Sequence, residues 1–341
     1  MPKVSVIIPA YNCESFIGRA VQSVLDQHHR DLEIIVVNDG STDNTVQALA
    51  PFLDRICLLQ QKNAGVAAAR NTGLRVARGD LVAFLDADDW WTPSRLSAQL
   101  AALESFPGTG MVFSDFAVAD STGAYLMPRG IRWKYGSIRN EHSAPWRKIF
   151  SNSITVHWDG SEIGQRQAIA YQGHIAQWLF SGNFINTCTV LLRREVVERL
   201  GEFDQTLDTE EDYDYWLRVA NEWPLVYVDA PLTTFRKSSG QLTRPDQIER
   251  IIQNALRVVQ RAQVRMAADL DPKMVNSRFS RMYLSLGVIA LRSGRCTDAR
   301  NYLKQSLKHR PWCLMTLALR SLAFLPPQVF AGIMRARAVL K

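Results

Sequence analysis

The sequence lacks the glycine-rich motifs with which the common nucleotide-binding folds hold phosphate. No Gly-x-Gly-x-x-Gly follows the first apolar segment, and no Walker A pattern occurs in the 341 residues. A dinucleotide-binding Rossmann site and a P-loop NTPase are therefore both disfavoured. The Asp-x-Asp-x-Asp-Gly loop of an EF-hand is also absent. Any phosphate that this chain binds needs a partner other than a glycine-rich loop.

Cysteine is scarce and is not arranged in pairs. The five residues are Cys13, Cys57, Cys188, Cys296 and Cys313. Their odd number and scattered positions argue against a disulfide framework or a zinc site and fit a reducing compartment. The N-terminal segment is broken early by Pro9 and does not resemble a signal peptide. We therefore expect a cytoplasmic protein.

Long apolar runs are missing as well. A membrane-spanning helix needs roughly 18 or more consecutive apolar residues. The nearest approach, residues 313–334, contains Arg320 and the pair Pro326-Pro327. Integral insertion into a membrane is therefore disfavoured.

The net charge of +7 conceals an asymmetry along the chain. Residues 1–240 carry 22 Lys and Arg against 28 Asp and Glu, whereas residues 241–341 carry 18 against 5, a net charge of +13. A basic tail favours a peripheral contact with an anionic membrane surface, although a solvated helix face remains open and nucleic acid is disfavoured. The last stretch, 313–341, is apolar and basic, and could lie in a membrane interface or pair two protomers as a homodimer.

Three carboxylates follow an apolar run typical of a buried parallel strand. Residues 81–85 form that run, and Asp86, Asp88 and Asp89 come at its end. Because unpaired acids are costly to bury, we expect all three at the carboxyl edge of a sheet, where ligands of open α/β folds bind. Asp86 and Asp88 alternate, so both can point at one divalent cation that also touches a phosphate.

The alternative for the same segment is a helix start. Thr92 would be the N-cap and Pro93 the first helical residue. In the favoured interpretation only Asp89 has such a capping role.

Apolar periodicity predicts strands and helices in alternation. The expected strands cover residues 4–9, 32–37, 56–60 and 81–85, and the expected helices cover 14–27, 43–52 and 66–77. This order is typical of a parallel sheet with right-handed crossovers. Polar residues follow the first two strands. Tyr11 there can stack on a base, and Asp39 can accept a hydrogen bond from a base N–H or a ribose hydroxyl.

Four motifs in order resemble the family-2 glycosyltransferases of GT-A fold. They are Val4 to Asn12, Ile-Ile-Val-Val-Asn-Asp-Gly-Ser-Thr-Asp at 34–43, Asn63 to Gly73, and Phe-Leu-Asp-Ala-Asp-Asp at 84–89. The resemblance covers about residues 1–240. It implies a Rossmann-like, mostly parallel sheet, a nucleotide-diphosphate sugar donor, an inverting transfer and a Mg²⁺ or Mn²⁺ ion.

Carried over by position, the resemblance implies that Pro9, Tyr11 and Asp39 hold the nucleoside. Arg70 would lie near the pyrophosphate, although a salt bridge on a helix surface is an open alternative.

The resemblance also assigns Asp86 and Asp88 as the Asp-x-Asp pair. Asp88 would be the direct metal ligand, and Asp86 would reach toward the ribose or the metal.

An acidic cluster at 210–214 resembles the family's Glu-Asp motif on the acceptor side. A carboxylate there can take the proton of the attacking hydroxyl. By position we expect Asp212 to be the base, with Glu211 second, whereas Asp214 is expected on the helix face. The alternative is an acidic first turn that the helix dipole favours.

The chain departs from the family after the strand at 225–228. The family often has Tyr-Arg-x-His-x-x-Ser, but residues 235–243 place Ser238 where the His would stand. If that His helps to hold the metal or the diphosphate, the contact is weaker here. Arg236 or Lys237 could compensate electrostatically.

Residues 125–180 are expected to be irregular and are rich in aromatic side chains. These are Tyr125, Trp133, Tyr135, Trp146, Trp158, Tyr171 and Trp178. They could stack against sugar rings of the acceptor or form a small satellite core.

We expect two domains. Residues 1–243 would form the GT-A domain, with a nucleotide-sugar-binding half at 1–122 and an acceptor half at 123–243. Residues 244–341 would form a basic α-helical extension with one tetratricopeptide-like helix pair.

The function implied is that of an inverting glycosyltransferase of hexosyltransferase type. Such enzymes commonly build bacterial cell-surface polysaccharide or lipopolysaccharide on saccharide or lipid-linked acceptors, at the inner face of the plasma membrane. The alternatives are a non-catalytic binding or scaffold protein that acts through its helical tail, and a sugar nucleotidyltransferase. The absence of a glycine-rich loop argues against the latter.

Overall fold

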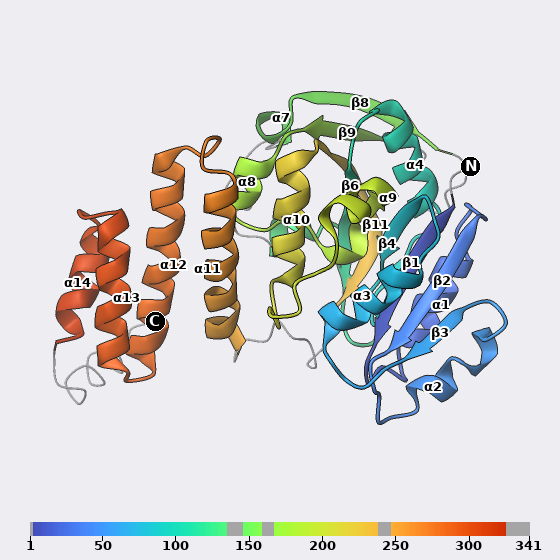
Figure 1. Ribbon diagram of the computed structural model, residues 1–341, viewed down its shortest axis with the longest axis horizontal. Helices are drawn as coiled ribbons and strands as arrows, with labels where there is room; N and C mark the ends of the chain where they lie inside the picture. The colour runs from blue at the N-terminus through green and yellow to red at the C-terminus, as the bar shows by residue number, and fades with distance from the viewer. Residues whose placement is uncertain (1–2, 135–145, 159–166, 238–246, 325–341) are drawn as a thin grey trace. The chain divides into compact units, whose positions relative to one another are not determined.

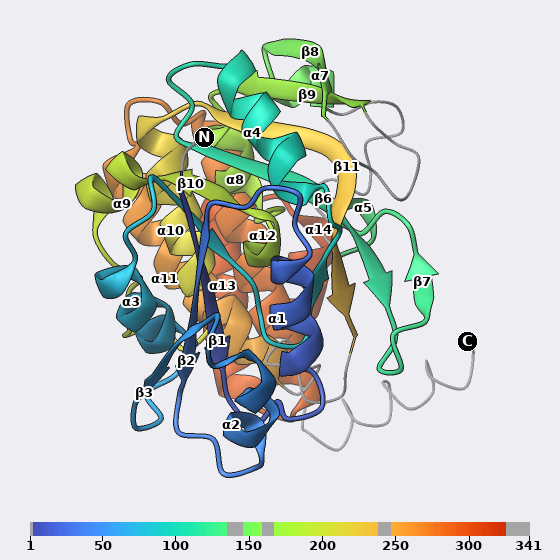
Figure 2. The same ribbon diagram turned by 90° about the vertical axis from the view of Figure 1, so that its right-hand side faces the viewer.

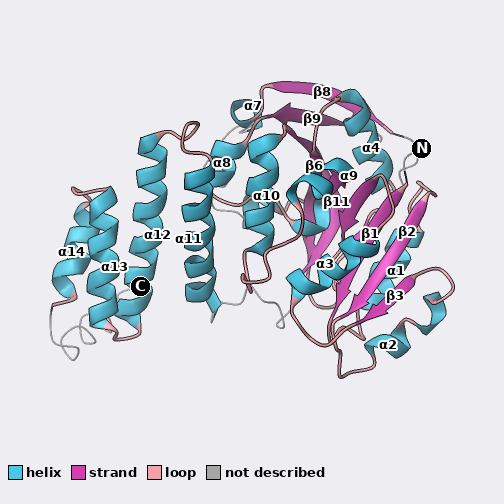
Figure 3. Cartoon of the chain, in the orientation of Figure 1, coloured by secondary structure: helices cyan, strands magenta, loops and turns pink. Residues whose placement is uncertain are grey.

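The computed structural model describes residues 3–134, 146–158, 167–237 and 247–324 (Figure 1). Contacts divide the chain into two compact units, residues 1–241 and 242–341. The first unit holds all the described strands, and the second is helical throughout its described part (Figure 3). The predicted domain boundary at residue 243 lies outside the described residues.

The described strands of the first unit form one mixed sheet. They are β1 (Val4–Ala10), β2 (Leu32–Asn38), β3 (Cys57–Gln60), β4 (Leu81–Phe84), β5 (Trp90–Trp91), β6 (Met111–Ala119), β7 (Tyr125–Met127), β8 (Asn152–His157), β9 (Gln167–Gly173), β10 (Leu191–Arg193) and β11 (Leu225–Arg236). The order is β3-β2-β1-β4-β10-β6-β11-β9-β8, with β5 on β11 and β7 on β6. The first four strands are parallel to one another, as the alternating pattern predicts.

Helices and short 3₁₀ turns connect these strands. They are α1 (Ile17–Leu25), α2 (Thr45–Ala48), η1 (Ala50–Phe52), α3 (Val66–Val76), α4 (Arg95–Ser105), α5 (Ile131–Lys134), α7 (Trp146–Ile149), α8 (Ala176–Ser181), η2 (Thr187–Thr189), α9 (Arg194–Leu200) and α10 (Glu211–Glu222). The single helix expected at 43–52 is divided into α2 and η1. Pro51 lies at the start of η1, where it cannot donate a backbone hydrogen bond to a continuing α-helix.

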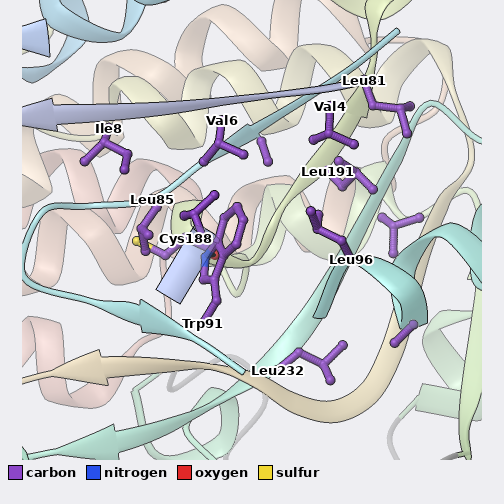
Figure 4. Close-up of a cluster of buried hydrophobic side chains, with 14 of the residues drawn as sticks. Val4, Val6, Ile8, Leu81, Leu85, Trp91, Leu96, Cys188, Leu191 and Leu232 are labelled. Carbon is purple, nitrogen blue, oxygen red and sulfur yellow. Dashed lines mark hydrogen bonds between the residues drawn. The ribbon is translucent and has the colours of Figure 1, made fainter. Parts of the chain in front are cut away.

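The parallel strands separate two layers of helices, with α1 on one face and α3 on the other (Figure 2). Val4, Val6 and Ile8 alternate along β1 and join one buried cluster together with Leu96 and residues of α1. Figure 4 shows this face of the sheet. On the opposite face, a Cβ on Gly73 of α3 would lie 2.5 Å from Ile7 Cγ2. Only glycine therefore lets α3 approach the sheet this closely.

The second half of the unit is more regular than the sequence indicated. Within 125–180, β8 and β9 form an antiparallel pair, and β9 continues the sheet at Tyr227 and its neighbours in β11. The expectation of an irregular segment was therefore wrong for these strands and for α8. Farther along the chain, the turn η2 is followed by the short strand β10.

Most described aromatic side chains of this segment are packed inside. Trp146 lies 4.0 Å from Tyr227 between ring centroids, and Trp158 and Tyr171 are also buried. Burial favours the satellite core for these three. Tyr125 and Trp178 are exposed, whereas the side chain of Trp133 and the whole of Tyr135 lie outside the described part.

The second unit consists of α11 (Ile248–Arg265), α12 (Pro272–Arg292), α13 (Cys296–His309) and α14 (Leu314–Leu322). The predicted helix pair corresponds to α12 and α13. Gly287 of α12 lies against Leu303 of α13, where a Cβ would come within 2.7 Å of the leucine side chain. Among the described residues, no helix is long and apolar enough to span a membrane.

Candidate active site

The predicted site residues lie at the carboxyl edge of the parallel strands. Pro9 is buried within β1, and the next strand, β2, ends just before Asp39. The Asp39 backbone N–H donates to the carbonyl of Ala10 at 2.8 Å, so the two strand ends are joined directly. Tyr11 is half exposed beside them, with its ring available for stacking.

Asp39 is buried and organises the loop that leads into α3. Its carboxylate accepts hydrogen bonds from the Gln61 amide at 2.7 Å, from the backbone of Ala64 at 2.9 Å and from that of Gly65 at 2.9 Å. Gly65 has φ +88° at the start of α3, a conformation that favours glycine. Asp39 thus connects the second motif to the third. Its carboxylate can accept at most one more hydrogen bond.

Arg70 of α3 joins the two acidic motifs. Its Nη2 lies 2.9 Å from Oδ1 of Asp86, and its Nη1 lies 2.6 Å from Oε1 of Glu211. The arginine is buried, which contradicts the alternative of a salt bridge on a helix surface. Burial opposes its charge, but the carboxylates of Asp86 and Glu211 raise the pKa of Arg70 above its ordinary value. It therefore stays a cation.

Glu211 is the buried acid of this bridge. Burial raises the pKa of its carboxyl to about 7, the Arg70 guanidinium opposes that rise, and neighbouring Asp212 adds to it. A carboxyl with a pKa near neutrality can exchange a proton at working pH. Its ion pair with Arg70, however, occupies one of its oxygens.

Asp212 is more accessible than Glu211 and has different partners. Its Oδ2 accepts from the hydroxyl of Thr187 at 2.7 Å, and its Oδ1 accepts from the backbone of Tyr213 at 2.6 Å. Asp214 instead faces the body of the unit, where it pairs with Arg218 at 2.9 Å. Asp212 is therefore the accessible acid of the cluster, whereas Asp214 has a structural role.

Two residues within the site motifs have left-handed backbone conformations. Among the described residues, Asn12 with φ +47° and Glu210 with φ +67° are the non-glycine residues with positive φ. Asn12 follows β1 and is held by hydrogen bonds with Ser41 and Thr42. Glu210 precedes α10 directly. Such conformations cost free energy and concentrate at functional sites.

Asp89 differs from the prediction for it. It is buried, and its Oδ1 accepts from the backbone N–H of Arg236 at 2.8 Å. Burial, followed by the charges of Asp88 and Asp86, raises its pKa well above the ordinary range.

The helix-cap interpretations of this segment are also wrong. After Asp89 the chain stays extended, because β5 pairs with β11. Helix α4 begins at Arg95, and its N-cap residue is Ser94. Asp89 therefore caps no helix, and Thr92 is not the N-cap.

The acidic motif offers two sets of possible metal ligands. One oxygen each from Asp86 and Asp89 and the sulfur of Cys188 lie within 4.8 Å of one another. Burial raises the pKa of the Cys188 thiol well above its usual value, and a neutral thiol does not suit a hard cation. The partly exposed carboxylates of Asp86 and Asp88 fit Mg²⁺ or Mn²⁺ better.

Arg236 lies directly beside this motif. Its Nε donates to the backbone carbonyl of Asp88 at 3.0 Å, and its Nη1 donates to that of Ser121 at 2.8 Å. The position of Ser238 lies outside the described residues. The sequence reasoning named Arg236 only as a possible electrostatic substitute, and its place against Asp88 comes from the long strand β11.

Two residues of the site were missed in the sequence. The backbone N–H of Asp86 lies 3.2 Å from the sulfur of Cys188, and Thr187 supports Asp212. Both belong to η2, whose start is marked by Asn186 accepting from the backbone of Cys188 at 3.0 Å. The Asn at that position, typical of a cap, was the available signal.

Replacing Glu211 by Gln should change how stability depends on pH. Because the folded pKa lies near 7, above the ordinary 4.5, the folded state binds the extra proton. Glu211 thus contributes stability that is full below pH 4.5 and is lost as pH rises through 7. We expect Glu211→Gln to remove up to about 3 kcal/mol of this decline. Urea unfolding from pH 4.5 to 8 measures it.

The matched control is Glu104→Gln, which alters an exposed glutamate of α4. Its unfolding free energy should follow the wild-type pH dependence. If Glu211→Gln also follows it, Glu211 does not hold the extra proton.

The chain resembles known proteins in both sequence and fold. A family model described as "Glycosyl transferase family 2" matches residues 5–201. A stretch of 91 residues is 44% identical to Glycosyltransferase GlyA of Streptococcus pneumoniae and covers 26% of this chain and 13% of that protein. A stretch of 107 residues is 40% identical to the Escherichia coli UDP-Glc:alpha-D-GlcNAc-diphosphoundecaprenol beta-1,3-glucosyltransferase WfaP and covers 31% and 43%. The chain spans less than two thirds of the length of either relative.

Solved structures show the same fold at low sequence identity. The crystal structure of S. aureus TarS 1-349 in complex with UDP-GlcNAc superposes with a TM-score of 0.62 at 17% identity, over 98% of this chain and 92% of that chain. The complex of the same protein with UDP gives a TM-score of 0.58. The mixed sheet and the helical C-terminal region therefore have the fold of these structures.

Proposed function

Because the chain belongs to glycosyl transferase family 2, we propose that it transfers a sugar from a nucleotide-diphosphate donor to an acceptor hydroxyl with inversion. The observation that carries the proposal is the bridge from Asp86 through Arg70 to Glu211, which joins the donor motif to the acceptor motif. In this proposal the donor, the acceptor and the base share one edge of the sheet.

In this proposal the nucleoside lies against Tyr11, beside the ends of β1 and β2. Pro9 shapes the floor, and Asp39 has capacity left to accept a hydrogen bond from a base or ribose. Arg70 lies close to the diphosphate. Its buried Nε has no hydrogen-bond partner among the described residues, so a donor capacity is left there.

The leaving diphosphate has to be neutralised without a glycine-rich loop. The carboxylates of Asp86 and Asp88 would hold Mg²⁺ or Mn²⁺, whose charge stabilises a departing phosphate. The proton transfer is carried out by residues of the chain. Asp212 accepts the proton of the acceptor hydroxyl, and Thr187 holds its carboxylate in place through the 2.7 Å hydrogen bond.

A thermal-shift screen of nucleotide sugars with and without Mn²⁺ tests this function. We expect at least one donor to raise the melting temperature of the wild-type protein, and to do so more strongly with Mn²⁺. Asp88→Ala should lose the Mn²⁺ increment. Donor hydrolysis in the presence of Mn²⁺ would count against a purely non-catalytic scaffold. If no donor shifts the wild-type protein under either condition, the proposed function is wrong.

The similarity to WfaP supports a role in bacterial cell-surface polysaccharide, with a lipid-linked acceptor. WfaP is named for a diphosphoundecaprenol substrate. A peripheral contact of the present chain with the inner face of the plasma membrane belongs to the same proposal. It is supported by the charge of +13 on residues 241–341.

An apolar face in the second unit favours the membrane contact. The exposed residues are Trp312, Leu314, Met315, Leu317 and Phe324. On the other side of α14, Thr316 and Ala323 are buried. Apolar patches of this kind are rare on monomeric proteins, and together with basic neighbours they are typical of helices that lie in an anionic membrane interface.

We expect the wild-type protein to sediment with vesicles of anionic phosphatidylglycerol and not with neutral phosphatidylcholine. Leu314→Glu combined with Leu317→Glu should weaken this binding about tenfold or more, because two exposed apolar side chains that would enter the membrane interface are replaced by anionic ones. Val264→Glu, an exposed position on α11, is the control and should bind as wild type. Unchanged binding of the double variant would contradict the membrane contact. A concentration-dependent dimer that the double variant abolishes would identify a second copy as the occupant.

A further inference from the structure

The first turn of α1 carries a cation where helices ordinarily favour an anion. Arg19 is the third residue of this helix, and no acidic residue lies in its first turn. The positive end of a helix dipole disfavours a cation there. Local conflicts of this kind are expected mainly at functional sites.

Arg19 is solvent-exposed, and it stacks on an aromatic ring without an acidic partner. Its guanidinium carbon lies 3.5 Å from the ring centroid of Trp90. Gly123, at φ +92°, lies so close that a Cβ there would approach Nη1 of Arg19 to 2.7 Å. Among the described residues, no hydrogen bond or ion pair engages this guanidinium. The acid of the same loop, Asp120, accepts from the backbone of its own turn at Thr122.

A second guanidinium faces the same ring. The guanidinium carbon of Arg236 lies 4.8 Å from the centroid of Trp90 and 4.8 Å from that of Phe16. Burial and the charge of Arg236 lower the pKa of Arg19. Two guanidinium groups thus lie near one aromatic ring and close to a helix N-terminus, an arrangement that suits the binding of an anion.

The position of this pair indicates which anion. Arg236 also donates to the backbone carbonyl of Asp88 at 3.0 Å, so the pair lies beside the acidic motif. We propose that Arg19, together with Arg236, binds a phosphoryl group next to Asp86 and Asp88. The group is either the diphosphate of the donor or a phosphate of the acceptor, and it extends the proposed transfer site.

The test is isothermal titration with inorganic pyrophosphate and, separately, with UDP. Arg19→Gln should weaken the binding of one of these anions about tenfold, the loss expected for one charge-assisted contact. Arg19→Lys should retain part of the affinity. Arg55→Gln, an exposed arginine of the same unit, is the matched control and should bind as wild type.

Two arms separate the sources of the phosphate. If Arg19→Gln weakens UDP but not uridine, Arg19 contacts the donor diphosphate. If UDP binding is unchanged but pyrophosphate no longer binds the UDP-saturated variant, Arg19 serves an acceptor phosphate. If Arg19→Gln equals the wild-type protein in every titration, including the case in which the wild type binds neither anion, the proposal is overturned. If the wild-type protein binds pyrophosphate but not UDP, the donor is not a uridine nucleotide, and the pyrophosphate titration decides the role of Arg19.

Discussion

Asp212→Asn is expected to lower the turnover number of sugar transfer by about 10²–10⁴-fold, the range that a general base contributes. The amide cannot accept the proton of the acceptor hydroxyl. The amide oxygen can still accept from the backbone N–H of Tyr213, and the amide N–H can donate to the hydroxyl oxygen of Thr187. The local structure should therefore persist. Steady-state kinetics with the donor identified by thermal shift measures the effect, and the KM of the donor should change little.

The comparison with Glu211→Gln decides which acid is the base. If Asp212 is the base, Glu211→Gln should cost less turnover than Asp212→Asn. The opposite order would assign the proton transfer to Glu211. Glu222→Gln, at the far end of α10 in an exposed pair with Arg199, is the control and should retain turnover. Near-normal turnover of Asp212→Asn would exclude Asp212 from the role.

Arg70→Met is expected to cost about 3–5 kcal/mol of unfolding free energy at pH 8, as removing one partner of a buried ion pair does. The change leaves Glu211 buried and charged, and removes the contact between the two acidic motifs. At pH 5 the loss should be smaller, because Glu211 then takes up a proton. Urea unfolding at both pH values measures the difference.

The same helix provides the control for this prediction. Arg75→Met removes an exposed ion pair with Glu202 at 2.7 Å and should cost less than about 1 kcal/mol. Adding Glu211→Gln to Arg70→Met should recover part of the lost stability, because no buried charge is then left without a partner. If Arg70→Met and Arg75→Met cost the same, the bridge does not stabilise the fold.

Much of the first half was predictable from local pattern. The periods of two and 3.6 residues located the four parallel strands and the helices α1 and α3, and the family resemblance and the GT-A fold with a helical extension are confirmed. The carboxyl ends of parallel strands lie at one edge by geometry. The position of Asp39, Asp86 and Asp88 at that edge was therefore predictable before any contact was known.

The errors occur where the partner of a residue is distant in the chain. Asp89 was expected near the surface. It is buried instead, and its carboxylate accepts a hydrogen bond from the backbone of Arg236, 147 residues later in the chain. The strands β8 and β9 were missed, because their pairing with each other and with β11 selects the extended conformation more than their composition does.

The sequence alone determined the order of the elements, the sheet edge that carries the site, and the residue types available there. These depend on periodicity and strand direction, which are local properties. Only the tertiary structure decided that Arg70 pairs with Glu211, 141 residues away, and that Arg19 has no such partner among the described residues. No local pattern encodes which charges meet, because desolvation and pairing depend on elements that the fold brings together from distant parts of the chain.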